Sequence, residues 1–153
     1  MSVDFRRQHA DGASIVDHLK RCESNFLPSL GSRVEIDAYA KKMAVSADLF
    51  EAWMGEDLIG LIAVYCNAVD RGVAFVTNVS VVSTWQGRGI ASCLLSSCIN
   101  HVRKLGFSSI ELDVNKMNAP AIALYKNHGF SIVRQEGDAY RMGLTLADRP
   151  NVN

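Results

Sequence analysis

Two glycines one residue apart stand between a β-branched run and an amphipathic helical pattern, and this junction constrains the fold more than any other stretch. The chain from Gln86 to Ala91 has the sequence Gln-Gly-Arg-Gly-Ile-Ala. Glycine leaves backbone N–H groups uncovered, and a helix N-terminus concentrates positive potential on such groups. A phosphate or pyrophosphate fits a turn of this kind. We therefore expect an anion site between a strand and a helix.

The overall charge requires this anion site to be local. The 153-residue chain has 16 Lys and Arg against 16 Asp and Glu, so its formal net charge is zero. A neutral chain has no global field that attracts nucleic acid or an anionic membrane, and we expect it to bind neither. No apolar run reaches membrane-spanning length, and the N-terminus lacks the apolar core of a signal peptide. The sequence thus predicts a cytoplasmic protein.

The cysteine pattern gives no sign of a metal site or a disulfide framework. The four cysteines, Cys22, Cys66, Cys93 and Cys98, form no CxxC pair. No histidine lies at zinc-ligand spacing from them. We predict reduced and mostly buried cysteines, and no bound metal.

The hydrophobic pattern predicts one domain over residues 1–147 and a polar C-terminal tail over 148–153. Apolar alternation predicts strands over 3–8, 49–54, 58–66, 73–82, 109–114, 130–135 and 139–146. Apolar residues three and four apart predict helices over 13–23, 34–45, 89–106 and 118–127. Their order gives an antiparallel meander, one central parallel βαβ crossover and a final hairpin. The expected fold class is α/β, with a mixed, mostly antiparallel sheet and helices on both faces.

Two common phosphate-binding fingerprints match the glycine turn poorly. A P-loop needs Gly, four residues and then Gly-Lys-Ser/Thr, which is absent. Gly87 and Gly89 supply the GxG of a dinucleotide-binding turn, and Asp113, at the end of the next strand, has the position of the acid that binds the ribose. Ser92 replaces the third glycine, however, and one βαβ unit leaves no room for a second mononucleotide half. A dinucleotide-binding module, or a turn that only packs a helix on a sheet, stays open as an alternative.

Two segments resemble the signatures of the Gcn5-related N-acetyltransferases (GNAT). Residues 86–91 resemble the (Q/R)-x-x-G-x-(G/A) pyrophosphate turn, and residues 118–130 resemble N-x-x-A-x-x-L-Y-x-x-x-G-F. The two occur in order, one strand apart, and the resemblance covers roughly residues 58–146. It implies an acyl-CoA N-acyltransferase fold, with acetyl-CoA as co-substrate. It also implies direct attack of an amine on the acetyl group.

The resemblance assigns a donor site to the turn and its neighbours. Backbone N–H groups of the turn would bind the pyrophosphate, helped by the Arg88 charge and the Ser92 hydroxyl. The strand before the turn would splay from its neighbour and pair its backbone with the pantetheine arm. Asn118 would cap its helix and touch the CoA arm. The expected donor residues are Val79, Ser80, Val81, Gln86, Gly87, Arg88, Gly89, Ile90, Ala91, Ser92, Asn118 and Tyr125.

The catalytic groups follow from the same resemblance. Tyr125 matches the family tyrosine that protonates the departing thiolate. The glutamate that many members carry near residue 82 is missing. Asp113 and Glu111 lie two residues apart on one strand face, and either could remove the amine proton through water. An amine that arrives partly neutral would need no dedicated base.

The acceptor amine is less constrained by the sequence. In the family, the loop that here spans residues 26–33 lines the substrate side, so we expect Phe26 and Arg33 to contact the acceptor. Asn78, on the strand before the glycine turn, is the third expected contact. A small-molecule amine such as an amino sugar, amino acid or polyamine is favoured, and a protein N-terminus is not excluded. A non-catalytic acyl-CoA-binding module is the alternative function. We expect a monomer or homodimer.

Overall fold

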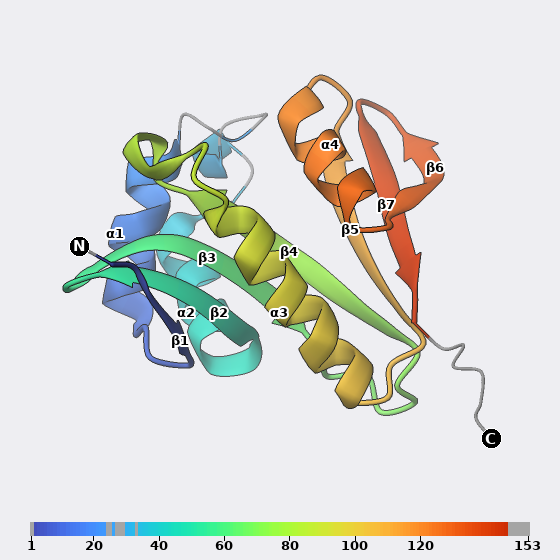
Figure 1. The fold of residues 1–153 in the computed structure, drawn as a ribbon, viewed down its shortest axis with the longest axis horizontal. Helices are drawn as coiled ribbons and strands as arrows, with labels where there is room; N and C mark the ends of the chain where they lie inside the picture. The colour runs from blue at the N-terminus through green and yellow to red at the C-terminus, as the bar shows by residue number, and fades with distance from the viewer. Residues whose placement is uncertain (1, 24–25, 27–29, 33, 147–153) are drawn as a thin grey trace.

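A single seven-stranded sheet, in the order β1-β2-β3-β4-β5-β7-β6, organises the chain. The computed structural model describes residues 2–23, 26, 30–32 and 34–146. The strands are β1 (Asp4–Arg7), β2 (Asp48–Met54), β3 (Asp57–Tyr65), β4 (Val73–Val81), β5 (Ser109–Asn115), β6 (Ser131–Glu136) and β7 (Ala139–Thr145). All neighbouring strands are antiparallel except β4 and β5, which are parallel. This confirms the predicted mixed sheet with one parallel crossover (Figure 1).

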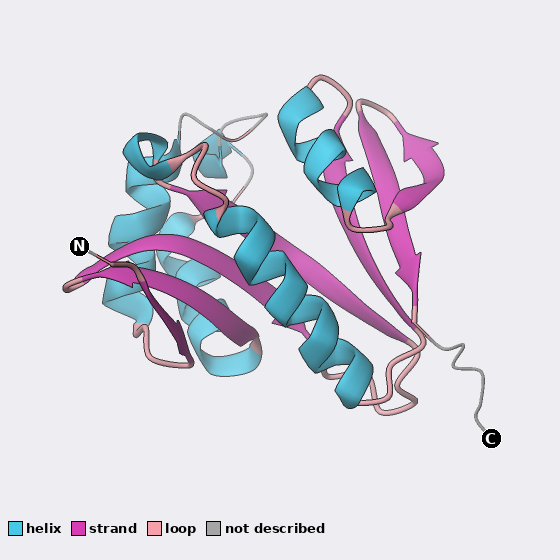
Figure 2. Ribbon diagram, viewed as in Figure 1, coloured by secondary structure: helices cyan, strands magenta, loops and turns pink. Residues whose placement is uncertain are grey.

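In the part of the chain that the structure describes, four α-helices cover the sheet. They are α1 (Gly12–Cys22), α2 (Ile36–Ser46), α3 (Ile90–Lys104) and α4 (Ala119–Asn127), with short 3-10 turns η2 (Leu30–Ser32) and η3 (Ser83–Trp85). Figure 2 shows α1 and α2 behind the sheet, and α3 and α4 in front of it. Asp11 caps α1 by accepting from the Ser14 N–H, and Asn118 caps α4 by accepting from the Ala121 N–H. Both caps satisfy helix-end donors that have no partner within the helix.

Strand alternation divides the apolar side chains between two cores. Leu49 of β2 packs with α1 and α2, whereas the next residue, Phe50, packs on the α3 side. Successive side chains of a strand point to opposite faces, so a fully buried strand contributes to both cores. The sheet is therefore the shared wall of two apolar layers, and its position fixes where both sets of helices lie.

β4 leaves β5 halfway along its length. The parallel pairing runs only from Val73 to Val76. On its other edge β4 stays paired with β3, but the register shifts there, so that Thr77 is an extra residue in the ladder. The Tyr39 hydroxyl donates to the Thr77 carbonyl at 2.6 Å. The second half of β4 therefore has no strand on the β5 side, and Figure 1 shows the two strands diverging.

Other predictions from the sequence have mixed outcomes. The predicted tail over 148–153 lies outside the described residues. The four cysteines are free, as predicted; Cys22 and Cys98 are buried, but Cys66 is only half-buried and Cys93 is exposed. In the described part of the chain, no helix combines the length and apolar character that a membrane span requires.

A close approach of β3 to α3 fixes the start of that helix. A Cβ atom added at Gly60 would lie 2.9 Å from Ile90 Cγ2 and 3.3 Å from Leu94 Cδ1. Ile90 is the first residue of α3, so contact with a glycine at this point sets how deeply the helix N-terminus lies against the sheet. A larger residue would push the helix and its N-terminal turn outward.

Replacing Gly60 with Ala should therefore destabilise the protein by about 1–3 kcal/mol, the usual cost of overpacking a core. Urea unfolding followed by circular dichroism measures the change. Gly12→Ala is the matched control, because no atom lies within 4 Å of its added methyl group and its backbone is helical. If both variants had the same stability, the proposed contact with α3 would not limit residue size at position 60.

Candidate active site

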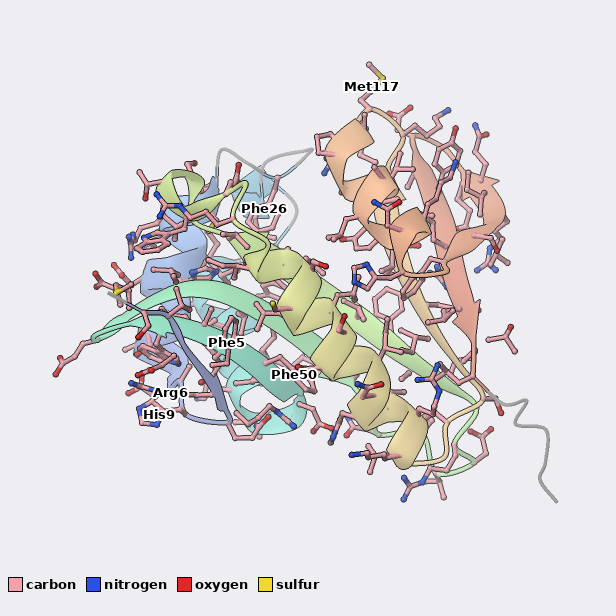
Figure 3. All side chains as sticks on the ribbon, in the orientation of Figure 1. Phe5, Arg6, His9, Phe26, Phe50 and Met117 are labelled. Carbon is pink, nitrogen blue, oxygen red and sulfur yellow. The ribbon has the colours of Figure 1, made fainter. Side chains whose placement is uncertain are left out.

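A cleft of about 870 Å³ lies where β4 and β5 diverge. It is lined by the second half of β4, the turn before α3, the face of α4 and the β6–β7 turn. Of the predicted site residues, those that line it are Phe26, Asn78, Val79, Ser80, Val81, Gln86, Gly87, Gly89, Ile90, Ala91, Ser92, Asp113, Asn118 and Tyr125. Arg88 and Glu111 do not line it, and Arg33 lies outside the described residues. Figure 3 labels Phe26 beside the turn that leads into α3.

The free edge of β4 presents backbone groups of alternate residues to this cleft. In an antiparallel pair, residues that exchange ladder hydrogen bonds alternate with residues whose backbone groups point away from the partner. The Val82 N–H donates to the Ile59 carbonyl at 2.9 Å, so by alternation the backbone of Ser80 also faces β3. Val79 and Val81 direct their backbone groups to the cleft. The expectation that the Ser80 backbone pairs with a ligand in the cleft is wrong, because Ser80 is one of the residues whose backbone groups face β3.

One of these backbone groups already has a partner. The Gln86 side-chain amide donates to the Val81 carbonyl at 3.1 Å. The N–H groups of Val79 and Val81 and the Val79 carbonyl remain directed to the opening. Gln86 thus ties the glycine turn to the end of β4, and this fixes the turn relative to the exposed backbone groups.

The glycine turn exposes the N-terminus of α3. Gly87 and Gly89 have φ values of 78° and 80°, in the left-handed region that glycine adopts without a steric cost. Gly89 is the N-cap, and no side chain caps the helix. The first N–H groups of α3, on Ile90, Ala91 and Ser92, have no acceptor within the helix. They form a positive end that lines the cleft.

Two predicted anion ligands have other partners. The Arg88 guanidinium lies 4.5 Å above the Trp85 ring and donates to the Thr84 carbonyl at 3.4 Å. Ser92 Oγ lies 3.2 Å from His128 Nε2. His128 Nδ1 must donate to the Leu124 carbonyl, 3.0 Å away, so the Nε2 of a neutral ring accepts the Ser92 proton. Ser92 therefore links α3 to α4 across the cleft.

Tyr125 is a buried phenol at the cleft wall. The residue is 6% exposed, and its ring centroid lies 5.9 Å from that of Phe130. Burial raises the pKa of Tyr125 well above its ordinary value, so the hydroxyl keeps its proton at neutral pH. Among the described residues, no hydrogen-bond partner of this hydroxyl is found. A buried hydroxyl beside a cleft is suited to donate to a bound ligand.

The two predicted carboxylates share one arginine that the sequence analysis did not identify. Arg141 of β7 donates to both oxygens of Asp113, at 2.5 and 3.1 Å, and to Glu111 Oε1 at 2.9 Å. These hydrogen bonds raise the pKa of Arg141, which stays charged. Asp113 and Glu111 do point the same way, as expected. The Asp113 side chain is 45% exposed and reaches the cleft, whereas that of Glu111 is 22% exposed and does not.

The charged side chains that line the described part of the cleft are all acidic. They are Asp113, Glu136 and Asp138, and the last two lie at the β6–β7 turn. One end of the cleft therefore carries the positive helix terminus and the other end carries carboxylates. Such an arrangement favours an anionic group at the first end and a cationic group at the second.

One group of possible metal ligands occurs among the described residues, away from the cleft. Ligand atoms of Asp48, Cys66 and His101 all lie within 4.8 Å of one another. Asp48 Oδ2 and His101 Nε2 are 2.7 Å apart and form an ion pair when the histidine is protonated. None of the three residues lines the cleft.

Comparison with known proteins identifies the family. The Acetyltransferase (GNAT) family model matches residues 13–130. The chain is 29% identical over 86 residues to mycothiol acetyltransferase of Corynebacterium glutamicum (strain R), which covers 56% of this chain and 29% of that protein. The match thus spans less than a third of that relative's length.

Solved structures share the fold at low sequence identity. The ribosomal-protein-S18-alanine N-acetyltransferase of Escherichia coli superposes with a TM-score of 0.77 and 18% identity, over 99% of each chain. The PaiA N-acetyltransferase of Thermoplasma acidophilum, solved in complex with coenzyme A, gives 0.75 and 16%, over 95% of this chain and 99% of that one. Because the family model matches well over half of the sequence, the chain belongs to the GNAT acetyltransferase family.

Proposed function

We propose that the protein is an acetyl-CoA-dependent N-acetyltransferase that works by direct attack of an amine on the thioester. The observation that carries this proposal is the convergence of three features in one cleft. An uncapped helix N-terminus, a strand edge without a partner strand and a buried phenol line it together. The family membership and the coenzyme A bound to the similar Thermoplasma protein support the same donor.

The donor would lie along β4, with its pyrophosphate at the start of α3. The N–H groups of Gly87 to Ser92 supply donors and the positive helix end, as phosphate binding requires. The Val79 backbone would pair with the pantetheine amides. The Val81 N–H, at the cleft edge of the same strand, is suited to polarise the thioester carbonyl. No metal is needed for this chemistry.

A cationic acceptor first releases one proton to solvent, because only the neutral amine has a free lone pair. Two further proton transfers then balance the reaction. The amine nitrogen forms a bond to the acetyl carbonyl carbon, and the carbon–sulfur bond breaks as the thiolate leaves. The Tyr125 hydroxyl protonates that thiolate. Asp113, which reaches the cleft, takes the amine proton through water. We assign this role to Asp113 rather than Glu111, because Glu111 does not line the cleft.

The acidic end of the cleft favours a cationic amine as acceptor. Asp138 and the pair Asp113 and Glu111, which Arg141 only half neutralises, would attract an ammonium group. Arg134 offsets the charge of Glu136. A small-molecule amine, such as an amino sugar, an amino acid or a polyamine, is our first candidate. A protein N-terminus is the second, because the similar Escherichia coli protein is named for acetylating a ribosomal-protein alanine.

A thermal-shift scan tests the donor. CoA and acetyl-CoA should raise the melting temperature, since a ligand at about 100 times its Kd stabilises by about 2.7 kcal/mol, whereas NAD and ATP should not. Gly89→Ala should abolish most of the CoA shift by displacing the turn.

Gly106→Ala is the matched control for that variant. Gly106 follows the other end of α3, also has a positive φ, 88°, and also has open space around its added methyl group. Both substitutions should cost roughly 1–2 kcal/mol of stability from the left-handed backbone. Only Gly89→Ala should lose the CoA response, and a wild type unresponsive to CoA and acetyl-CoA would refute the proposed donor.

Tyr125→Phe tests the acid and separates an enzyme from a binding module. The variant should lose about 10²- to 10⁴-fold in kcat and keep its CoA affinity, because the phenol is asked only to donate a proton. Since burial raises the pKa of Tyr125, the wild-type rate should not fall through ionisation of this group near pH 10, where exposed tyrosines titrate. Stopped assays of thiol release give kcat, and Tyr65→Phe serves as the control. An unchanged kcat would remove Tyr125 from the mechanism.

Asp113→Asn and Glu111→Gln are a matched pair of variants that tests which carboxylate accepts the amine proton. Each removes one carboxylate charge from Arg141, but only the first removes a cleft-lining carboxylate. If Asp113 receives the proton, kcat/KM should fall about 10²-fold in Asp113→Asn and change about threefold or less in Glu111→Gln. Equal losses in the two variants would mean that the ion pairs with Arg141 matter, and not a proton transfer to Asp113.

A further inference from the structure

A buried histidine lies directly behind the cleft wall. His18 of α1 is fully buried, and its two ring nitrogens each have a near partner. Nδ1 lies 2.8 Å from the Leu58 carbonyl oxygen of β3, and Nε2 lies 2.9 Å from Ser80 Oγ of β4. Ser80 Oγ in turn lies 2.7 Å from Asn78 Oδ1. Ser80 and Asn78 both line the cleft, so these contacts connect a buried ring to the active site.

The Leu58 carbonyl determines the direction of each hydrogen bond in the series that joins Leu58, His18, Ser80 and Asn78. A carbonyl oxygen only accepts, so His18 Nδ1 carries a proton. In a neutral imidazole the other nitrogen then has none, and Nε2 must accept. Ser80 supplies the donor, since its oxygen is the close partner at 2.9 Å; the Cys22 sulfur lies 3.7 Å away. The single Ser80 proton therefore points to His18.

The ring is neutral at physiological pH. Desolvation lowers the pKa of His18 to about 4, because burial disfavours the charged form. Arg21 lowers this pKa further, whereas Asp17 raises it and the Leu58 carbonyl favours the protonated ring. The neighbouring Cys22 thiol is uncharged, since burial raises its pKa to about 11.

The same direction continues to Asn78. With its own proton on His18, Ser80 Oγ can only accept from Asn78. The structure places Asn78 Oδ1 toward Ser80, so this hydrogen-bond direction requires the amide to be turned by 180°, with its nitrogen facing Ser80. The two atoms of an amide have nearly the same shape, and the hydrogen-bond partners decide which atom occupies which place. The other amide atom, now the oxygen, has no second partner among the described residues. Asn78 is 4% exposed and lines the cleft, so this oxygen is directed to the ligand space.

We propose that His18 is a positioning residue that, through Ser80, directs the Asn78 carbonyl oxygen into the cleft as the hydrogen-bond acceptor for the substrate amine. Ser80 and Asn78 point to the α1 side of β4, whereas Val79 and Val81 pack on the α3 side, where the donor turn lies. One N–H of the amine held by Asn78 would leave the nitrogen lone pair directed at the acetyl carbon. This inference rests on the proposed N-acetyltransferase function.

The tautomer of His18 provides a test that needs no substrate. Long-range ¹H–¹⁵N NMR of the histidine-labelled full chain at pH 7 should show His18 as a neutral ring protonated on Nδ1. His18→Gln assigns the signal. If that variant fails to fold, single substitutions of His9, His101 and His128 assign it by elimination, because the chain has four histidines. An Nε2-protonated ring or an imidazolium at pH 7 would overturn the proposal.

Kinetics then test the link to the amine. Ser80→Ala removes the connection between His18 and Asn78, and should raise KM for the amine about tenfold with KM for acetyl-CoA unchanged. Ser80→Thr keeps the hydroxyl and should retain most of the affinity. Spermidine and a short peptide with an N-terminal alanine are the two probe amines. Ser97→Ala, an exposed serine on α3, is the control.

The outcomes separate this inference from the proposed function. Loss of the CoA response in the wild type would refute the function and leave the tautomer result to decide the hydrogen-bond direction. A normal CoA response with acetylation of a probe amine, but equal amine KM in wild type and Ser80→Ala, would overturn the positioning role alone. A rise in both KM values would also overturn it, because a general distortion of the cleft would explain that result.

Discussion

The site depends on the point where two parallel strands stop pairing. β4 and β5 share hydrogen bonds only as far as Val76, and the extra residue Thr77 then turns β4 away. Side chains on the α2 side of the sheet hold the two strands at this point. Arg141 contacts Glu111 and Asp113 of β5 and lies 5.1 Å from the Phe75 ring of β4. On the same face Tyr39 of α2 bonds to Thr77. These contacts fix the two strands where they diverge. The opening between them can therefore hold a narrow ligand that forms hydrogen bonds with the free edge of β4.

Two histidines, one on each side of this cleft, have the same pattern of hydrogen-bond partners. His18 and His128 each donate from Nδ1 to a backbone carbonyl, of Leu58 and Leu124. A carbonyl oxygen can only accept. In the neutral ring of His18, and in the neutral form of His128, Nε2 therefore accepts from a serine that lines the cleft, Ser80 or Ser92. With these partners, the Ser80 and Ser92 hydroxyl protons point to the histidines and not into the cleft that both serines line.

The sequence predicted the features that depend on local chemistry. Gly87 and Gly89 take left-handed conformations that few other residues tolerate, and strand alternation follows from burial on two faces. The features it did not predict join residues far apart in the chain. His18 and Ser80 are 62 residues apart, and Arg141 and Asp113 are 28 apart. Such pairs depend on strand register and helix placement, which no local pattern fixes. The same reason accounts for the wrong expectation about the Ser80 backbone.

The two ends of the cleft differ in charge, although the net charge of the whole chain is zero. Arg141 offsets one of the two charges on Glu111 and Asp113, and Arg134 pairs with Glu136 at 2.6 Å. This end therefore keeps a net negative charge, from one carboxylate of the first cluster and from Asp138. At the other end the α3 terminus supplies the equivalent of about half a positive charge. Fields from exposed groups fade within about 8 Å in physiological salt, so each end acts on its own ligand without cancelling the other. An anionic donor and a cationic amine would then enter with opposite orientations, and their reactive ends would meet in the middle, between the Val81 N–H and the Tyr125 hydroxyl.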